Sequence, residues 1–523
     1  MTPHQQNLCL SINGIDNAFE ASGLLRLFLP EEPVLLPLPG MWNGQLPAVC
    51  ASFGTVVRIE AVETAERFEA SACGFRSGQA AGHGVWGLSL HEAEGPAALL
   101  TGSRKLCAGT ALYRALAQAF AVSLPWGSLT GVRPAKLAAC LLDAGMPEPA
   151  ARGMLTERTG MSAEKADLLL TVAARERPFR TPPADSVSLY VGIPFCATRC
   201  LYCSFTAYPV QRHGQWIPAY LDALGRELDF VGEWMARHGK RFSAVYIGGG
   251  TPTALSGEDL ARLFDRMERA LPMETALEFT VEAGRPDTVD AGKLAAIRRA
   301  GATRISINPQ SMHAATLRRI GRAHTPEQVE TAFGLARDAG FTNINADLIA
   351  GLPGETPDDF QETLARMAPL CPDSLTVHTM AVKRASRLHE SIVQGQAEPR
   401  TSDTDVATMV AEAARFAQAR GLLPYYLYRQ KHILANLENT GYARPGAECR
   451  YNIETMSERQ TILAAGSGAI TKVSHGGDDM ERTENVRDLS HYIGRIDEMI
   501  GRKRAVLARH YPDGPDGPMD AGR

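Results

Sequence analysis

Three cysteines lie close together, directly after a run of β-branched and aromatic residues. They are Cys196, Cys200 and Cys203, in the sequence Tyr-Val-Gly-Ile-Pro-Phe-Cys-Ala-Thr-Arg-Cys-Leu-Tyr-Cys that begins at Tyr190. Thiolates are soft ligands that suit zinc or an iron–sulfur cluster. A closed structural site normally takes four protein ligands, and no Cys or His follows at the short spacing of a fourth. Three thiolates on a four-iron cube would leave one iron open to a substrate.

A second motif favours such a cluster over the alternative, a zinc knuckle that lacks its fourth ligand. The strand predicted at 243–247 ends in Gly248-Gly249-Gly250-Thr251-Pro252-Thr253. Three glycines let the backbone approach a ligand closely and present amide groups without side-chain obstruction. Each motif ends a predicted strand, and together, in this order, they indicate one ligand site.

Composition narrows the classes of function. The chain has 523 residues and a net charge of −4, which gives no electrostatic case for a nucleic-acid partner. No uninterrupted apolar run has the length of a membrane span, and the N-terminus lacks the features of a signal peptide. The other seven cysteines are dispersed and are typical of reduced, buried thiols, so we expect a cytoplasmic protein.

The centre of the chain alternates between strand and helix patterns, which predicts six parallel β/α repeats. The predicted strands are 187–193, 243–247, 277–283, 304–308, 344–349 and 374–380. The predicted helices lie near 216–237, 257–270, 290–300, 326–339 and 357–368.

The two flanking segments carry other patterns. Residues 1–183 predict an α+β domain of unknown role, with a strand at 55–62, a helix at 105–121 and short helices over 148–177. Residues 386–523 predict a further α/β segment, with amphipathic helices at 401–420 and 486–503 and a disordered tail.

Polar residues recur where the central strands end: Glu282, Gln310, Asp347 and His378. An acid within an apolar strand is costly unless it is paired. Glu282 or Asp347 alone would suggest a buried structural pair. Both at corresponding strand ends favour ligand binding, because function collects at the carboxyl ends of such strands.

The cysteine spacing and the Gly-Gly-Gly-Thr-Pro turn resemble the radical S-adenosylmethionine (SAM) superfamily. Further motifs are similar to its oxygen-independent coproporphyrinogen III oxidase group, and specifically to the HemZ branch of that group. These motifs are Asn308-Pro-Gln-Ser, Asp347-Leu-Ile-Ala-Gly-Leu-Pro, Asn439 to Asn452, Leu129-Thr-Gly-Val-Arg-Pro-Ala-Lys and Tyr428-Arg-Gln-Lys. The resemblance implies an α/β fold, with a partial (β/α)6 barrel at 184–385 between the two flanking domains.

The resemblance also implies the ligands. Cys196, Cys200 and Cys203 would hold a 4Fe–4S cluster, whose open iron chelates SAM. The contacts to this SAM would come from Tyr190, Gly249, Glu282 and Ile470. A second SAM is held in the oxidases by positions that correspond here to Tyr202, Gly250, Thr251, Gln310, Arg322, Asp347 and Ala381.

The implied reaction is the oxidative decarboxylation of coproporphyrinogen III propionates to vinyl groups, with an electron donor such as flavodoxin or ferredoxin. Two departures leave alternatives open. The fourth cysteine of the best-understood oxidases is replaced by Phe205. The His-Asn-x-x-Tyr-Trp marker of the related HemW-like haem chaperones is replaced by Tyr451, Asn452, Thr455 and Met456. A haem-binding carrier and a radical enzyme for another tetrapyrrole are therefore the alternatives.

Overall fold

The computed structural model describes most of the chain. The described residues are 8–13, 18–28, 34–35, 55–63, 67–76, 79–89, 103–131, 133–396, 400–430, 433–476 and 480–512. The chain forms two compact units. One comprises 1–175 with 427–431 and 436–438, and the other comprises 176–426, 432–435 and 439–523. The predicted domain boundaries at 183 and 385 stay predictions.

Six parallel strands form the centre of the second unit. In spatial order they are β6 (Ser186–Ile193), β9 (Arg241–Gly249), β10 (Glu278–Glu282), β11 (Arg304–Gln310), β12 (Ile344–Ala350) and β13 (Ser374–Thr379). Each pairs in parallel with its neighbours in the chain order of the repeats. The predicted partial barrel is therefore confirmed. Its strands are almost wholly buried, as expected for a sheet with covered faces.

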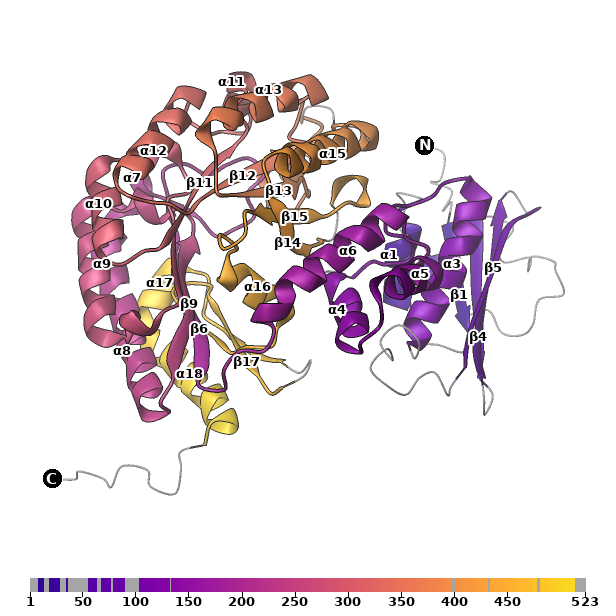
Figure 1. Cartoon of the computed structure of the whole chain (residues 1–523), viewed down its shortest axis with the longest axis horizontal. Coiled ribbons are helices and arrows are strands. Elements are labelled where there is room, and N and C mark those ends of the chain that lie inside the picture. Colours follow the sequence, from indigo (N-terminus) through magenta and orange to yellow (C-terminus); the bar gives the residue numbers. More distant parts are fainter. Residues whose placement is uncertain are drawn as a thin grey trace. The chain divides into compact units, whose positions relative to one another are not determined.

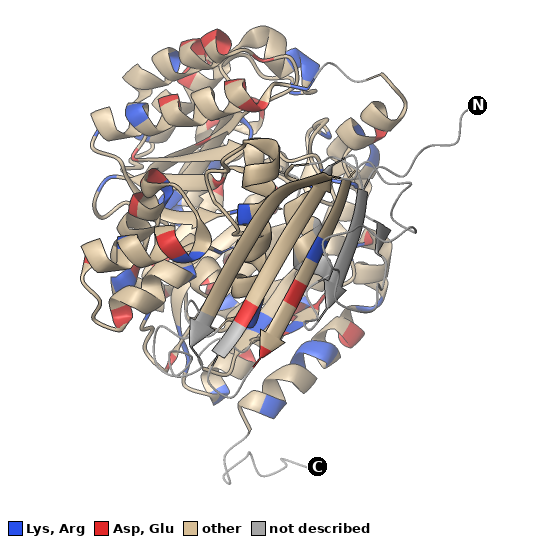
Figure 2. Ribbon diagram, turned by 90° about the vertical axis from the view of Figure 1, so that its right-hand side faces the viewer, with Lys and Arg blue, Asp and Glu red and all other residues tan. Residues whose placement is uncertain are grey.

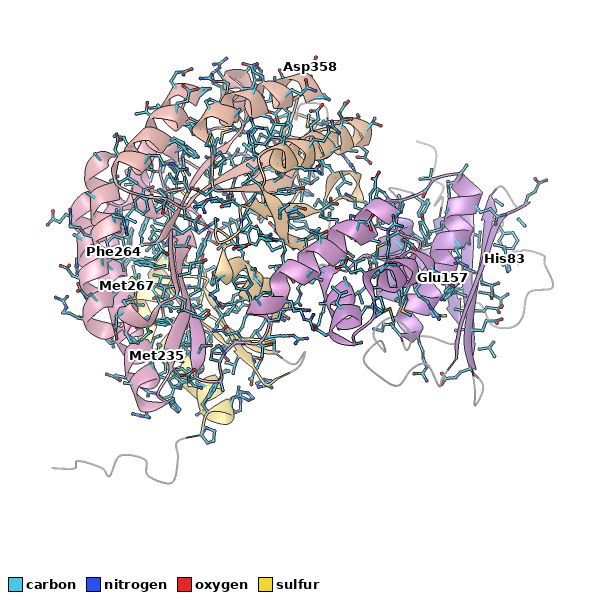
Figure 3. All side chains as sticks on the ribbon, viewed as in Figure 1. His83, Glu157, Met235, Phe264, Met267 and Asp358 are labelled. Atoms are coloured by element: carbon cyan, nitrogen blue, oxygen red, sulfur yellow. The ribbon has the colours of Figure 1, made fainter. Side chains whose placement is uncertain are left out.

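Helices cover the outer face of this sheet (Figure 1). They are α8 (Ile217–Arg237), α9 (Gly257–Ala270), α10 (Ala291–Arg299), α12 (Pro326–Asp338) and α13 (Pro357–Met367), as the sequence predicts. Met235 of α8 and Phe264 and Met267 of α9 are buried (Figure 3). The Phe264 ring meets Phe279 of β10 edge-on, so the apolar stripe of α9 packs on the sheet.

Strands from the C-terminal segment extend the sheet on both sides. β15 (Asn439–Ala443) pairs antiparallel with β13, and β14 (Leu423–Tyr428) lies beyond it. On the other side, β16 (Ile462–Ala465) pairs in parallel with β6, followed by β17 (Ile470–Ser474) and β18 (Met480–Glu484). The strands β14 to β18 of the C-terminal segment therefore belong to the same sheet as the barrel.

Of the two helices predicted in the C-terminal segment, one is confirmed and the other is wrong. The helix expected at 401–420 is α15 (Asp403–Ala419). The prediction of a single helix at 486–503 is wrong. The chain forms two helices there, α17 (Leu489–Gly494) and α18 (Ile496–His510), with a break at Arg495. Gly494 favours the break because glycine is a poor helix former. The predicted disordered tail from 513 onward lies outside the described residues.

The first unit combines a sheet with helices, and confirms the expected α+β pattern. Its strands β1 (Leu8–Asn13), β2 (Val34–Leu35), β3 (Thr55–Glu63), β4 (Arg67–Arg76) and β5 (Gln79–Ser89) take the order β2-β1-β3-β4-β5. Helix α3 (Arg104–Phe120) packs on this sheet through a buried apolar cluster. Helices α4 (Ala135–Asp143), α5 (Glu148–Thr159) and α6 (Ala163–Glu176) build a second apolar cluster around Trp126.

Charged residues of both signs are interspersed over the helices (Figure 2). Within the described residues, no helix combines the length and the apolar character needed to cross a bilayer.

Candidate radical SAM site

The first cysteine is held where the loops after β6 and β9 run side by side. The Gly250 amide donates to the Ile193 carbonyl at 2.7 Å, and the Thr251 amide donates to the Phe195 carbonyl at 2.8 Å. The Thr251 hydroxyl donates to the Cys196 sulfur at 3.7 Å. The pairing of the two strands therefore continues into both loops and joins the cysteine motif to the glycine motif.

Glycine is required at this junction. A Cβ atom on Gly250 would lie 2.5 Å from the Phe195 carbonyl oxygen and 2.9 Å from the Cys196 sulfur. Gly249 has a φ of +111°, which L-residues with a side chain rarely adopt. The sequence suggested that these glycines approach a ligand, and the structure shows that Gly250 approaches the cysteine loop itself.

The three thiols are shielded from solvent, and their sulfur atoms are not all in close contact. Cys196 and Cys200 are each 8% exposed, and Cys203 is half-buried. Among the described residues, the one group of three metal-binding side chains whose ligand atoms all lie within 4.8 Å is found elsewhere. At least one pair of the three sulfur atoms is therefore more than 4.8 Å apart, whereas Zn–S bonds of about 2.3 Å would set all three about 3.8 Å apart around one zinc ion. A multi-iron cube suits this wider spacing.

The protonation of the buried thiols also favours a bound metal. Burial raises the pKa of the Cys196 thiol to about 11. A coordinating thiol is deprotonated by its metal, so bound iron would hold this sulfur as a thiolate at neutral pH. The three-cysteine set fits a 4Fe–4S cluster.

The far side of the cysteine loop is fixed by a residue that the sequence analysis missed. Arg285 donates from Nη1 to the Thr198 hydroxyl at 2.6 Å and pairs with both carboxylate oxygens of Asp287 at 3.0 Å. The Leu201 amide donates to the Ile320 carbonyl at 2.9 Å. Arg285 stands three residues after Glu282, just beyond the end of β10. This position after a barrel strand was the sequence signal that could have indicated its role.

Glu282 ends β10 and lies among aromatic rings. It accepts a hydrogen bond from the Tyr246 hydroxyl at 2.5 Å. Burial raises the pKa of its carboxyl to about 7, and the charge of Asp347 adds to the rise. The Tyr246 ring stacks on Tyr451 at 4.6 Å and on Tyr190 at 6.3 Å, between centroids. The sequence did not predict this stack, because Tyr451 comes from α16 (Arg450–Ser457), outside the six repeats.

Asp347 on β12 has partners of its own. Its carboxylate accepts from Asn345 Nδ2 at 2.7 Å and lies 3.7 Å from His378 Nε2. Burial would raise the pKa of this carboxyl, but His378 and neighbouring hydrogen bonds outweigh it and hold the pKa below the usual value. Glu282 and Asp347 are close enough to interact electrostatically, as their strand-end positions suggested.

Two predicted residues carry buried polar atoms without partners in the described part of the chain: Gln310 Oε1 and Arg322 Nε. Gln310 ends β11 with a φ of +69°, and Arg322 donates to the Asn308 carbonyl at 2.6 Å and to the Tyr202 hydroxyl at 3.3 Å. Buried polar atoms are normally paired, so a ligand is expected to complete these.

The two remaining predicted residues lie on the C-terminal strands and the loop after β13. Ala381 is buried and forms a single β-bridge with Ile433. Ile470 begins β17 and is 37% exposed. The structure gives neither residue a polar role.

Comparisons with known proteins agree with this geometry. Residues 190–367 match the Radical SAM superfamily. The chain is 40% identical over 395 residues to the oxygen-independent coproporphyrinogen-III oxidase-like protein HemZ of Bacillus subtilis, covering 74% of this chain and 77% of HemZ. It is 32% identical over 315 residues to the haem chaperone HemW of the same organism, covering 60% and 76%.

The solved structure of coproporphyrinogen III oxidase (HemN) from Escherichia coli, a radical SAM enzyme, is also similar. It superposes with a TM-score of 0.50 at 26% identity, over 62% of this chain and 73% of that one. The cofactors that follow are a 4Fe–4S cluster and SAM. With its cysteine and glycine motifs joined at the ends of β6 and β9, the chain belongs to the HemZ family of oxygen-independent coproporphyrinogen III oxidase-like radical SAM proteins.

Proposed function

We propose that this protein converts the propionate side chains of coproporphyrinogen III to vinyl groups, giving protoporphyrinogen IX. The observation that carries the proposal is the loop junction that sets Cys196 beside Gly250 and Thr251, in a chain 40% identical to HemZ. Each conversion removes one hydrogen atom from the propionate β-carbon, one carbon dioxide and one electron, which passes to an acceptor.

The three cysteines would hold the cluster and leave one iron for SAM. Together, the bound cluster and SAM supply a radical able to abstract the hydrogen. Tyr190, Gly249, Glu282 and Ile470 are the proposed SAM contacts. Of these, Glu282 has the best support, because its carboxylate lies beside Gly248, where a Cβ atom would be 3.0 Å from the carboxyl carbon. A carboxylate placed there can accept hydrogen bonds from ribose hydroxyls.

The proposal also includes the binding of a second SAM molecule. Its seven positions are Tyr202, Gly250, Thr251, Gln310, Arg322, Asp347 and Ala381. Support comes from the unpartnered atoms of Gln310 and Arg322. Thr251 and Asp347 already have protein partners, so they support it less.

The stacked rings of Tyr190, Tyr246 and Tyr451 support a substrate with apolar ring faces, such as the pyrrole rings of a tetrapyrrole. Aromatic side chains provide an apolar surface against which individual pyrrole rings can pack. They also keep water away from the reacting carbon, which protects a radical reaction from side reactions.

An anaerobic assay tests the proposal. Protein reconstituted with iron and sulfide is mixed with dithionite, SAM and coproporphyrinogen III, and the products are separated by chromatography. We expect protoporphyrinogen IX, with one methionine released for each propionate converted. SAM cleavage without any change in the tetrapyrrole would refute this substrate.

A haem carrier is the second candidate. It is favoured by the 32% identity to HemW and by Phe205, which is 69% exposed where the oxidases carry a further cysteine. Haem titration of the same preparation separates the two functions: stable haem binding without turnover supports a carrier. A radical enzyme for another tetrapyrrole would instead turn over a different macrocycle.

The cytoplasmic location and the reductant belong to the same proposal. Free thiols are found at Cys73, Cys196, Cys200, Cys203, Cys371 and Cys449, as expected in a reducing compartment. Flavodoxin or ferredoxin is the proposed class of electron donor.

A further inference from the structure

A cationic depression lies beside the cysteine loop. Its lining comprises Arg199, Arg384, Ala385, Ser386, Arg387, His389, Glu390, Val393 and Gln394. Arg199 stands between the first two cluster cysteines, and the other residues belong to the segment that leads into α14 (Arg387–Val393), forms it and caps its C-terminus. None of these residues has a role in the proposed reaction.

This depression is attached to the backbone that carries the cluster ligands. The Leu388 amide donates to the Leu201 carbonyl at 2.9 Å, and Leu201 directly follows Cys200. Arg199 donates from Nη2 to the Ala385 carbonyl at 3.0 Å. The depression is therefore a protein surface held within one residue of a cluster ligand.

The charge of the depression differs from that of the whole chain. Arg199, Arg384 and Arg387 are exposed and face a single acid, Glu390, whereas the chain carries a net charge of −4. Val393, which is 72% exposed, adds an apolar contact. An exposed cationic rim around an apolar contact suits a transient acidic protein partner.

The position of the depression indicates what that partner does. None of the eleven residues proposed to contact SAM lines it. SAM and the tetrapyrrole must meet at the open iron, so electrons have to reach the cluster by another side. The depression offers a surface on such a side, next to Cys200.

We propose that this depression, and the exposed arginines Arg384 and Arg387 in particular, is the docking surface for a small acidic one-electron carrier protein. On docking, one electron leaves the carrier and enters the cluster, so the carrier is oxidised and the cluster reduced by one electron each. This rests on the proposed function only in requiring a cluster that is reduced from outside. The contact is expected to be small and weak, as redox encounters are.

The experiment uses reconstituted full-length protein without substrate. Reduced flavodoxin is the probe carrier, and bleaching of the cluster absorbance is followed by anaerobic stopped flow. The variant is Arg384→Glu/Arg387→Glu, which leaves Arg199 of the cysteine loop intact. The matched control is Arg269→Glu/Arg299→Glu, in which two exposed arginines near the C-terminal ends of α9 and α10 are reversed. Those helix ends face the opposite edge of the barrel from the cluster loop.

We expect the depression variant to lower the second-order rate of reduction by flavodoxin about tenfold at low salt, because rim charges act mainly on association. The difference should shrink as salt screens the charges. Flavodoxin binding, measured by interferometry, should weaken in parallel. Reduction by photoreduced deazaflavin, a small neutral reductant, should be unchanged, which confirms an intact cluster.

Two results would overturn the proposal. One is a flavodoxin rate equal to that of the control variant. The other is an unchanged flavodoxin rate with loss of coproporphyrinogen III binding, which would assign the arginines to substrate carboxylates. Because no substrate is needed to measure reduction, failure of the decarboxylation assay leaves this test intact.

Discussion

Two clusters of buried polar side chains, around Glu438 and around Gln310, differ in whether their polar atoms have partners. In the first unit, the Glu438 carboxylate accepts from Trp126 Nε1 at 2.9 Å and from Lys165 Nζ at 2.5 Å. At the barrel mouth, Gln310 Oε1 and Arg322 Nε are buried and have no partner within the described residues. A satisfied network stabilises a fold, whereas an unpaired buried atom costs free energy unless a ligand completes it. Substitutions in the two regions should therefore separate stability from ligand binding.

The largest effect is expected at the cluster. Cys200→Ala removes one of three iron ligands, so the iron content of reconstituted protein should fall to background. Colorimetric iron and sulfide analysis measures this. The matched control is Cys371→Ala, which removes an exposed thiol. Full iron content in the Cys200 variant would refute the ligand assignment.

The Glu438 network should govern stability alone. Glu438→Ala leaves the Lys165 charge and the Trp126 N–H without their partner, so we expect a loss of roughly 4 kcal/mol in the free energy of unfolding. Urea denaturation measures this, and SAM affinity should stay unchanged. Glu157→Ala, an exposed acid of the same unit, is the control (Figure 3). If Glu438→Ala weakened SAM binding and left the free energy of unfolding unchanged, Glu438 would belong to the ligand site and not to a stabilising network.

Glu454 on α16 gives a prediction about pH. It accepts hydrogen bonds from the Ser188 and Ser243 hydroxyls, and burial raises the pKa of its carboxyl from 4.5 to about 7. A raised pKa means that the folded state binds the proton more tightly. The stability that this gives is full below pH 4.5 and is lost as pH rises through about 7.

Glu454→Gln keeps a neutral hydrogen-bonding side chain at every pH. The variant should therefore match the wild type near pH 4.5 and exceed it by about 3.5 kcal/mol above pH 7, since each pKa unit corresponds to about 1.4 kcal/mol. Chemical denaturation at a series of pH values checks this. Parallel stability curves for the two proteins would contradict this, because they would show that the pKa of Glu454 is the same in the folded and unfolded states.

The smallest effect is expected at Gln310. Gln310→Ala removes a buried oxygen that lacks a partner in the described residues, together with packed side-chain atoms, so we expect a loss of roughly 1 kcal/mol in the free energy of unfolding. If a bound SAM donates a hydrogen bond to this oxygen, the affinity for that SAM should fall about tenfold in the variant. Calorimetric titration with SAM measures affinity and stoichiometry, with exposed Gln418→Ala as the control. Unchanged binding would remove Gln310 from the site.

Local patterns were sufficient to predict the barrel. Each of the six strands carries an apolar run bounded by loop residues, and each expected helix between them is present. The cysteine and glycine motifs were also predicted to lie together, because consecutive parallel strands end at the same edge.

Long-range pairings were beyond the sequence analysis. The contact between Trp126 and Glu438 joins residues 312 positions apart, and nothing in either local pattern indicates it. Tyr451 stacks on Tyr246 although it belongs to a helix of the C-terminal segment. A surface tyrosine and a buried one have the same local pattern, so packing decides their role.

The most direct test of the account is electron paramagnetic resonance of the reduced, anaerobically purified protein with and without SAM. We predict a 4Fe–4S signal whose g values shift when SAM is added, because SAM binds the iron that the three cysteines leave open. A zinc-containing protein, or a cluster signal that SAM does not change, would contradict the account.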